Sequence, residues 1–180
     1  FNNLTTLNGS PYDANFDFLW NFQMGGVSTM PNPGLYYDTA GTFGVELIAT
    51  SSDNCTADTT IFITIHPKPN ADFSISTVCV GFPTNFSDSS TVSGGIINQW
   101  LWNIDNTSPN TPNPIYTYSE SGSFPVFLTV VTDQNCIDTA SGIAQVNPNP
   151  VVDFTASKQV INVLDNQVDF TNLTSGATAY

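Results

Sequence analysis

The residues that could carry out chemistry are a single histidine, three cysteines and a set of scattered aspartates. His66 stands directly before Pro67, so we interpret it as a solvated linker side chain rather than a catalytic base. Because no other histidine is present, neither a Ser-His-Asp nor a Cys-His arrangement can be built. The cysteines lack zinc-site spacing, and no glycine loop resembles a phosphate cradle. We therefore predict a non-enzymatic chain without a bound cofactor.

Calcium is the one ion that the aspartates bring into consideration, because it takes about six to eight converging oxygen ligands. The aspartates do not show the D-x-D-x-D spacing of an EF-hand. We therefore prefer solvated turn aspartates over a calcium site, and we predict no metal ligands. The aspartates in or near expected turns are Asp13, Asp17, Asp72, Asp88, Asp105, Asp133, Asp138 and Asp153.

The charge of the chain excludes two classes of partner. Lys68 and Lys158 are the only lysine or arginine residues against 15 acidic ones, which gives a net charge of −13. Nucleic acid and anionic lipid repel such a chain. No apolar stretch approaches the roughly 18 residues of a membrane span, so we expect no direct membrane insertion. Since the sequence opens on Phe1 without a signal peptide, we expect it to be the interior of a longer chain.

A repeat with an interval of 81 residues organises the chain. The stretch DTAGTFGVELIATSSDNC (38–55) returns as SESGSFPVFLTVVTDQNC (119–136), and PKPNADF (67–73) returns as PNPVVDF (148–154). The repeat predicts the domain organisation. We expect residues 1–66 to form a domain lacking its first strand, residues 67–149 a complete domain, and residues 150–180 the first strands of a third.

Each unit reads as β-strands, because apolar and polar residues alternate with a period of two. Trp20 and Trp102 lie within such alternating runs, so we predict that both indoles occupy the centre of a core. Clusters of Gly, Pro, Asn, Asp and Ser interrupt the runs at short intervals, which is typical of an all-β sandwich. The predicted fold class is all-β, in the form of tandem immunoglobulin-like sandwich domains.

Two further pairs of equivalent residues are expected to shape the turns. Tyr37 and Tyr118 precede Gly41 and Gly122 by four residues, just before the strongest strand of each unit. This placement is similar to a tyrosine corner, in which the hydroxyl ties a turn to the backbone. The two glycines are expected to supply turns with positive φ.

The order Trp-x-Phe, Pro-x-x-x-Tyr, Gly-x-Phe-x-Val-x-Leu and Asn-Cys resembles the PKD domain family. The chain looks most like the tandem PKD repeats of very large secreted cell-surface proteins of the Bacteroidetes. The resemblance covers essentially the whole chain. It departs at the family's Trp-Asp-Phe-Gly-Asp-Gly turn, where this chain has WNFQMGG (20–26) and WNIDNT (102–107). Only Asp105 remains near that turn, so any role of the family's aspartate there does not carry over.

Two disulfide arrangements stay open for an extracellular protein. Cys79 could pair with Cys136 inside one domain, but the two turns are expected at opposite poles, roughly 23 Å apart. Bridged Cα atoms lie only about 4.4–6.8 Å apart. The alternative is a staple between neighbouring domains, in which a late-turn cysteine such as Cys55 or Cys136 meets an early-turn cysteine of the preceding domain. We favour the staple.

The resemblance also implies a modification. Secreted Bacteroidetes proteins of this kind are O-glycosylated at an Asp followed by Ser or Thr and an apolar residue. The sequence DTA occurs at 38–40 and at 138–140, which makes Thr39 and Thr139 candidates. Ordinary turn threonines are an equally good interpretation.

The leading functional hypothesis is mechanical. Rigid β-domains joined by short proline-bearing linkers line up as a semi-stiff rod. We expect a stalk or filament segment of a giant cell-surface adhesin, with neighbouring repeats of the same chain as its partners. The resemblance implies an extracellular location, export by the type IX route and a role in adhesion or gliding motility.

Two alternatives remain. The first is an accessory module that binds glycans or surface proteins, for which Tyr12, Phe82 and Tyr116 would supply surface rings. The second is a polymer subunit in which strands donated between chains complete the partial domains.

Overall fold

The computed structural model describes residues 6–7, 10–11, 16–160, 164 and 167–176. All regular secondary structure in these residues is β-strand, so the predicted all-β class is confirmed. The chain divides into two compact units. The first unit comprises Phe1–Lys68 with Val92–Ile96, and the second comprises Pro69–Thr91 with Ile97–Tyr180. Within the described part of the chain, no helix has the length and apolarity needed to cross a membrane.

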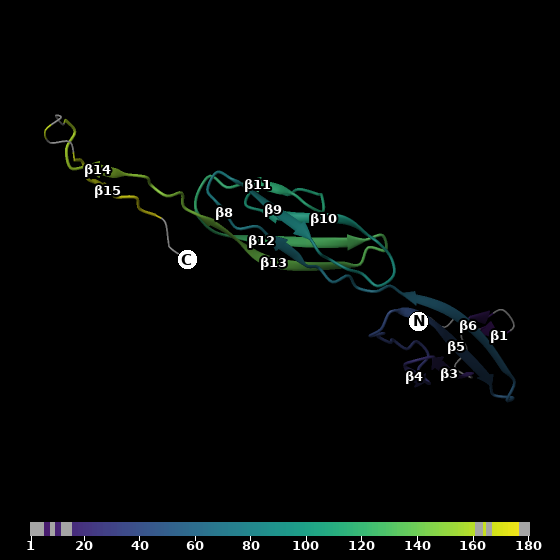
Figure 1. Cartoon of the computed structure of the whole chain (residues 1–180). Helices are drawn as coiled ribbons and strands as arrows, with labels where there is room; N and C mark the ends of the chain where they lie inside the picture. The colour runs from purple at the N-terminus through teal and green to yellow at the C-terminus, as the bar shows by residue number, and fades with distance from the viewer. Residues whose placement is uncertain (1–5, 8–9, 12–15, 161–163, 165–166, 177–180) are drawn as a thin grey trace. The chain divides into compact units, whose positions relative to one another are not determined.

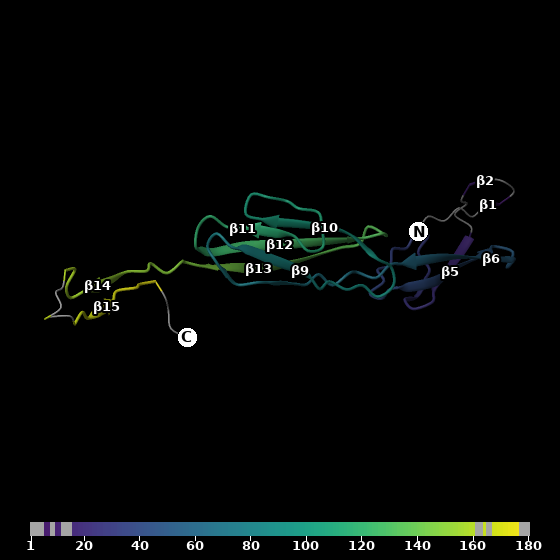
Figure 2. The same cartoon turned by 45° about the horizontal axis from the view of Figure 1, so that its top comes forward.

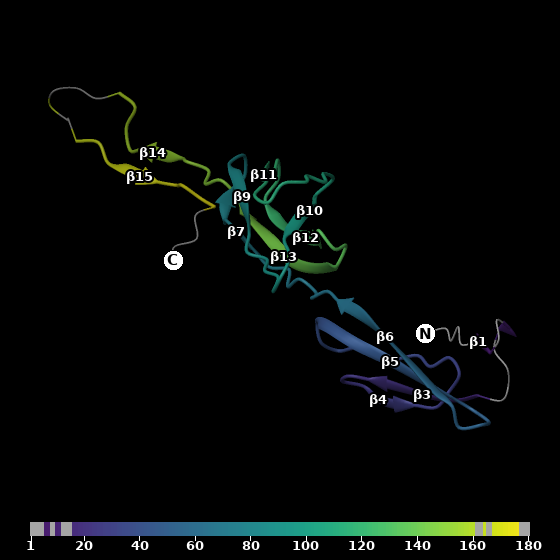
Figure 3. The same cartoon turned by 90° about the vertical axis from the view of Figure 1, so that its right-hand side faces the viewer.

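The first unit is built on a four-stranded antiparallel sheet in the order β4-β3-β5-β6 (Figure 3). These strands are β3 (Phe16–Phe22), β4 (Gly26–Ser28), β5 (Gly41–Ser51) and β6 (Thr56–Ile65). The alternation along β3 places Phe18, Trp20 and Phe22 on one buried face, where they pack with Val45 and Leu47 of β5. A separate short hairpin pairs β1 (Thr6–Leu7) with β2 (Ser10–Pro11).

The second unit contains two sheets of three or more strands (Figure 1). The larger has the order β10-β12-β13-β8, and the smaller has the order β11-β9-β7. The larger sheet consists of β8 (Val78–Cys79), β10 (Ile97–Ile104), β12 (Gly122–Thr132) and β13 (Ile137–Asn147). The smaller sheet consists of β7 (Phe73–Ile75), β9 (Pro83–Asp88) and β11 (Ile115–Thr117). Strand β8 runs parallel to the end of β13, whereas the other pairs are antiparallel.

The core of the second unit joins the two sheets. The indole of Trp102 on β10 lies 5.1 Å from the ring of Phe73 on β7 and 5.7 Å from that of Phe86 on β9, measured between centroids. Ile104 and Val126 add side chains with no exposed surface. Burying an apolar side chain of this size contributes about 1.5–3 kcal/mol. Because both sheets turn their apolar faces to one core, the second unit is a β-sandwich.

A further hairpin follows the second sandwich along the chain (Figure 2). It pairs β14 (Phe154–Ala156) with β15 (Phe170–Asn172). Its register resembles that of β7 with β9, since Ala156 lies opposite Phe170 as Ile75 lies opposite Phe86. The domain limits at 66/67 and 149/150 stay predictions.

Candidate functional site

The two tryptophans at the predicted core positions make equivalent hydrogen bonds. Trp20 is buried, and its indole Nε1 donates to the backbone oxygen of Met30 at 3.1 Å. Trp102 is buried too, and its Nε1 donates to the backbone oxygen of Thr111 at 2.9 Å. Each indole therefore fills a core and also fixes a loop further along the chain, which follows β4 for Trp20 and β10 for Trp102.

The turns before the last long strand of each unit are also equivalent. The backbone N–H of Ser51 donates to the oxygen of Cys55 at 2.9 Å, and that of Thr132 donates to Cys136 at 2.9 Å. In return, the cysteine N–H groups donate to the side-chain oxygens of Ser51 and Thr132. Asn54 and Asn135 hold the positive φ that each turn needs, at 60° and 61°. Asparagine tolerates this left-handed conformation better than most residues.

The tyrosine-corner prediction is wrong for both tyrosines. The hydroxyls of Tyr37 and Tyr118 are buried and find no hydrogen-bond partner among the described residues. The rings instead stack on Phe43 and Phe124, with centroids 4.7 and 4.3 Å apart. In both units the stacked ring belongs to the phenylalanine two residues after the glycine. These tyrosines therefore stabilise their units through apolar contact.

Burial has a titration consequence at Tyr118. It raises the pKa of this phenol to about 12, and the negative charge of Asp105 adds to the effect. The neighbouring Tyr116 donates its hydroxyl to Asp105 Oδ2 at 2.8 Å, and this bond also raises the pKa of Tyr116. Asp105, the one acid left near the divergent turn, thus accepts a tyrosine hydroxyl.

Gly41 and Gly122 are the first residues of β5 and β12, and they do not form separate turns. Their φ angles are positive, at 157° and 156°, and each lies opposite a residue of the next strand. A Cβ at these positions would lie 3.2 Å from the ring of Phe43 and 3.6 Å from that of Phe124. The contact at Gly41 is tight, so a side chain there would press on the ring of Phe43, whereas the distance at Gly122 is ordinary van der Waals contact.

The arrangement of the strands excludes a Cys79–Cys136 bond within the second unit. Cys79 lies opposite Asn147, the last residue of β13, whereas Cys136 directly precedes Ile137, the first. A strand of 11 residues separates the thiols by roughly 30 Å, against about 4.4–6.8 Å between bridged Cα atoms. The staple between neighbouring domains stays a prediction, and Cys55 is exposed at the equivalent turn of the first unit.

The two threonines named as modification candidates occupy different environments. Thr39 is exposed in the loop before β5. Thr139 is exposed near the start of β13, where its hydroxyl shares a hydrogen bond with that of Thr129 at 2.9 Å. The interpretation as an ordinary turn threonine is therefore wrong for Thr139, which lies in a strand. O-glycosylation at either position stays a prediction.

The aspartates make individual hydrogen bonds. Within the described ranges, no group of three or more His, Cys, Asp or Glu residues could hold a metal ion. Asp88 Oδ2 accepts the indole N–H of Trp100 at 2.6 Å, and Asp138 Oδ2 accepts the backbone N–H of Ala71 at 2.9 Å. Asp13 falls outside the described residues.

The structure describes two of the three surface rings expected of a binding module, and these two differ in exposure. Phe82 is exposed in the turn between β8 and β9, whereas Tyr116 is half-buried on β11 and bonded to Asp105. Tyr12 falls outside the described residues. His66 is exposed directly after the end of β6.

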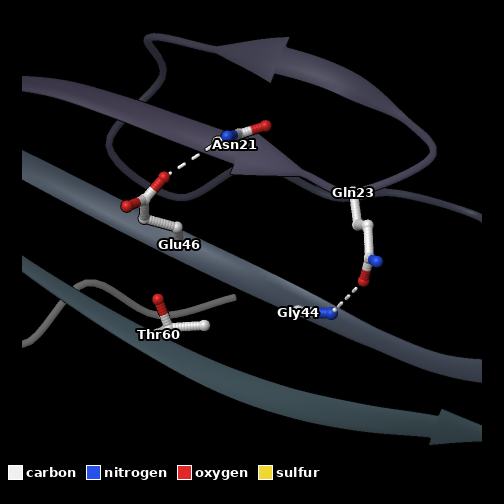
Figure 4. A pocket seen from close by; sticks show the side chains of 5 residues that line it. All are labelled: Asn21, Gln23, Gly44, Glu46 and Thr60. Carbon is white, nitrogen blue, oxygen red and sulfur yellow. Dashed lines mark hydrogen bonds between the residues drawn. The ribbon is translucent and has the colours of Figure 1, made fainter.

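A small polar depression of about 250 Å³ lies on the outer face of the first unit's sheet (Figure 4). Asn21 Nδ2 donates to Glu46 Oε2 at 3.3 Å, and Gln23 Oε1 accepts the backbone N–H of Gly44 at 2.9 Å. Thr60 supplies a hydroxyl from β6. These bonds hold the amide and carboxylate groups over a floor formed by Gly44. We name this feature the Gly44 depression.

The sequence analysis missed the Gly44 depression, although the repeat contains a signal for it. The residue equivalent to Gly44 in the second unit is Pro125, and the residue equivalent to Glu46 is Phe127. Strand β3 ends at Phe22, so the Gly44 N–H needs the Gln23 side chain, whereas proline has no N–H to satisfy. Divergence between repeats at outward positions, where the core imposes no residue type, indicates a surface specific to one unit.

Comparison with known proteins identifies the class of the second unit. Residues 66–147 match the PKD domain family. The PKD1 domain of Vibrio anguillarum Epp is 22% identical over 47% of this chain and 100% of that chain, with a TM-score of 0.44. The PKD1 domain of the Vibrio cholerae metalloprotease PrtV is 26% identical over 46% of this chain and 98% of that chain, with a TM-score of 0.38. The fibronectin(III)-like modules of Clostridium thermocellum CbhA are 12% identical over 77% of this chain and 83% of that chain, with a TM-score of 0.41. No curated protein matches the chain.

Residues 66–147 are therefore a PKD domain, and its all-β sandwich is the fold that the sequence predicted.

Proposed function

We propose that this chain is part of a non-catalytic, extracellular stalk made of tandem β-sandwich domains. The observation that carries the proposal is that the same hydrogen bonds occur inside the first unit and inside the second. Trp20 and Trp102 each fix a later loop through Nε1, and the two hairpin turns share their hydrogen bonds and their left-handed asparagine. The repeated hydrogen bonds therefore serve the structure of each unit, because they hold loops and turns in place.

The linkers support a mechanical role. Strand β6 ends at Ile65, and Asn70 already pairs with Thr91 of the PKD domain through hydrogen bonds of 2.8 and 3.0 Å. Only residues 66–69 lie between, and two of them are prolines. Prolines restrict the backbone and stiffen a short linker.

The second linker has the same form. Strand β13 ends at Asn147, and Val151 pairs with Ser175 through hydrogen bonds of 2.8 and 2.9 Å. Residues 148–150 lie between and include two prolines. Both junctions are therefore too short for a flexible tether, which suits a load-bearing segment better than a pair of independent binding heads.

The wider setting of the proposal comes from the family. PKD domains occur in secreted proteins and are typically non-catalytic modules, which supports an extracellular place and a structural role. The repeat pattern resembles very large cell-surface proteins, so the proposed whole is a giant adhesin or filament of the gliding type, exported by the type IX route. Neighbouring repeats of the same chain are its proposed partners.

Residual dipolar couplings of the full chain test the stalk. We expect the couplings of β3, β5 and β6 to fit one alignment tensor together with those of β10, β12 and β13. Replacing Pro67 and Lys68 by glycine should split the data into two tensors without changing the structure of either unit. Two independent tensors in the unsubstituted chain would contradict the proposal.

A further inference from the structure

We propose that the Gly44 depression binds one residue of a neutral polysaccharide chain. This inference does not depend on the stalk proposal, because it rests on a surface of the first unit alone. The site lies on the outward face of β3, β5 and β6, where Asn21, Gln23, Glu46 and Thr60 surround Gly44 (Figure 4).

Gly44 is the first argument for a ligand. It lies in the interior of a strand, where glycine is less stable than alanine by roughly 0.5–1 kcal/mol. No left-handed φ requires a glycine there. A Cβ would meet Phe62, Thr60 and Gln23 at 3.6–3.7 Å, which is ordinary contact, so no close neighbour requires it either. A glycine without a backbone reason in a strand often marks a place where a ligand approaches closely.

The second argument is that some hydrogen-bonding groups of the lining residues have no partner among the described residues. Glu46 uses Oε2 on Asn21, and Gln23 uses Oε1 on the Gly44 N–H. The amide Nε2 of Gln23 can therefore donate, Glu46 Oε1 and Asn21 Oδ1 can accept, and the Thr60 hydroxyl can do both. Sugar hydroxyls are donors and acceptors at once, so they match a mixed set of this kind.

Phe62 adds an exposed apolar ring beside Gly44, next to the residues that line the depression. Its side chain is 75% exposed on β6, and its ring is the neighbour that a Cβ on Gly44 would meet at 3.6 Å. A ring that borders a polar depression offers a surface for the C–H face of a pyranose, while the amides and the carboxylate bind its hydroxyls. Few polar groups placed beside one apolar surface are the usual composition of a small-molecule site.

Charge and size define the ligand further. None of the described residues that line the depression is basic, and the chain carries a net charge of −13, so phosphorylated and uronic-acid ligands are disfavoured. A volume of about 250 Å³ lies below the usual range for a whole drug-sized ligand. The depression therefore accommodates one sugar unit of a longer neutral chain.

The test is an NMR titration of the ¹⁵N-labelled full chain with cellohexaose, chitohexaose and mannohexaose. We expect at least one hexasaccharide to shift the amides of Asn21, Gly44 and Thr60 in a saturable way. Gly44→Ala should weaken that association about tenfold or more, because its methyl group occupies the floor. Thr60→Val, which keeps the shape and removes the hydroxyl, should weaken it too.

The matched control is Pro125→Ala, which changes the equivalent position of the PKD domain and should leave the association unchanged. A lysine side chain is the competing ligand, because Glu46 and Phe62 could hold an ammonium group. N-acetyl-lysine methylamide is therefore titrated in parallel. Binding of that probe alone, absence of binding by all three hexasaccharides, or equal binding by the Gly44→Ala variant would overturn the proposal.

Discussion

Tyr118 combines a stabilising ring with an unfavourable hydroxyl. Its ring stacks on Phe124, and the side chain is only 2% exposed. The hydroxyl has no partner among the described residues, and leaving such a group buried without one costs about 1–3 kcal/mol. Tyr37 repeats the arrangement on Phe43, so the two units share this unfavourable feature as well as their favourable ones.

Tyr118→Phe should therefore raise the free energy of unfolding at neutral pH by about 1 kcal/mol, because it removes the hydroxyl and keeps the ring. Urea unfolding followed by circular dichroism measures the change. Tyr116→Phe is the matched control, since that substitution removes the bond to Asp105 and should bring no stabilisation. A Tyr118→Phe variant less stable than the unsubstituted chain would show that the hydroxyl has a partner.

The raised pKa of Tyr118 predicts a pH dependence. The folded value of about 12 lies above the ordinary value of 10.0, so the folded state holds this proton more tightly than the unfolded state. The contribution of this tighter proton binding to the free energy of unfolding is fully present below pH 10, and it is lost as the pH rises towards 12. Between these values the unsubstituted chain should lose stability more steeply than Tyr118→Phe. Parallel slopes in alkaline unfolding curves would contradict the raised pKa.

At the scale of elements, the hairpin turns at Asn54 and Asn135 join the longest strands of each unit. The left-handed φ of 61° at Asn135 suits asparagine or glycine, whereas alanine there costs about 1–2 kcal/mol. Asn135→Ala should lower the free energy of unfolding of the PKD domain by that amount, and Asn135→Gly should not. Urea unfolding of both variants measures the difference, and equal loss in both would mean that the asparagine side chain matters more than φ.

The cysteines give a second prediction at this scale. Because β13 separates Cys79 from Cys136, oxidation of the monomeric chain should yield no peptide that links them. Mass spectrometry of a non-reduced digest, with a reduced digest as control, tests this. A Cys79–Cys136 peptide from monomeric protein would require the parallel pairing of β8 with β13 to be wrong.

The elements also show what the sequence could predict. A period of two is enough to assign strands and to place Trp20 and Trp102 on an inward face, because burial of one sheet face follows from alternation. The alternation of apolar and polar residues does not tell which group a hydroxyl will hydrogen-bond to. The prediction for the hydroxyls of Tyr37 and Tyr118 was wrong for this reason. The Gly44 depression also escaped, because a cross-strand cluster depends on the register between β3, β5 and β6.

At the scale of the whole molecule, the PKD domain contains all the side chains of its own core. Trp102, Phe86 and Val146 belong to one buried cluster whose members all lie between residues 71 and 146. Among the strands that the structure describes, its two sheets likewise use only those from β7 to β13. A fragment of residues 67–149 should therefore fold by itself and unfold in one cooperative transition. Its midpoint in urea should match that of the same domain in the full chain.

The control for this fragment is one of residues 1–66, whose buried cluster draws on β3 and β5 of a single sheet among the described residues. A sheet with one apolar face needs a second layer to be stable, so this fragment should show weak or no cooperative unfolding. Amide exchange of both fragments against the full chain measures the difference. Rapid exchange throughout β12 and β13 in the fragment of residues 67–149 would show that the predicted domain limits are wrong.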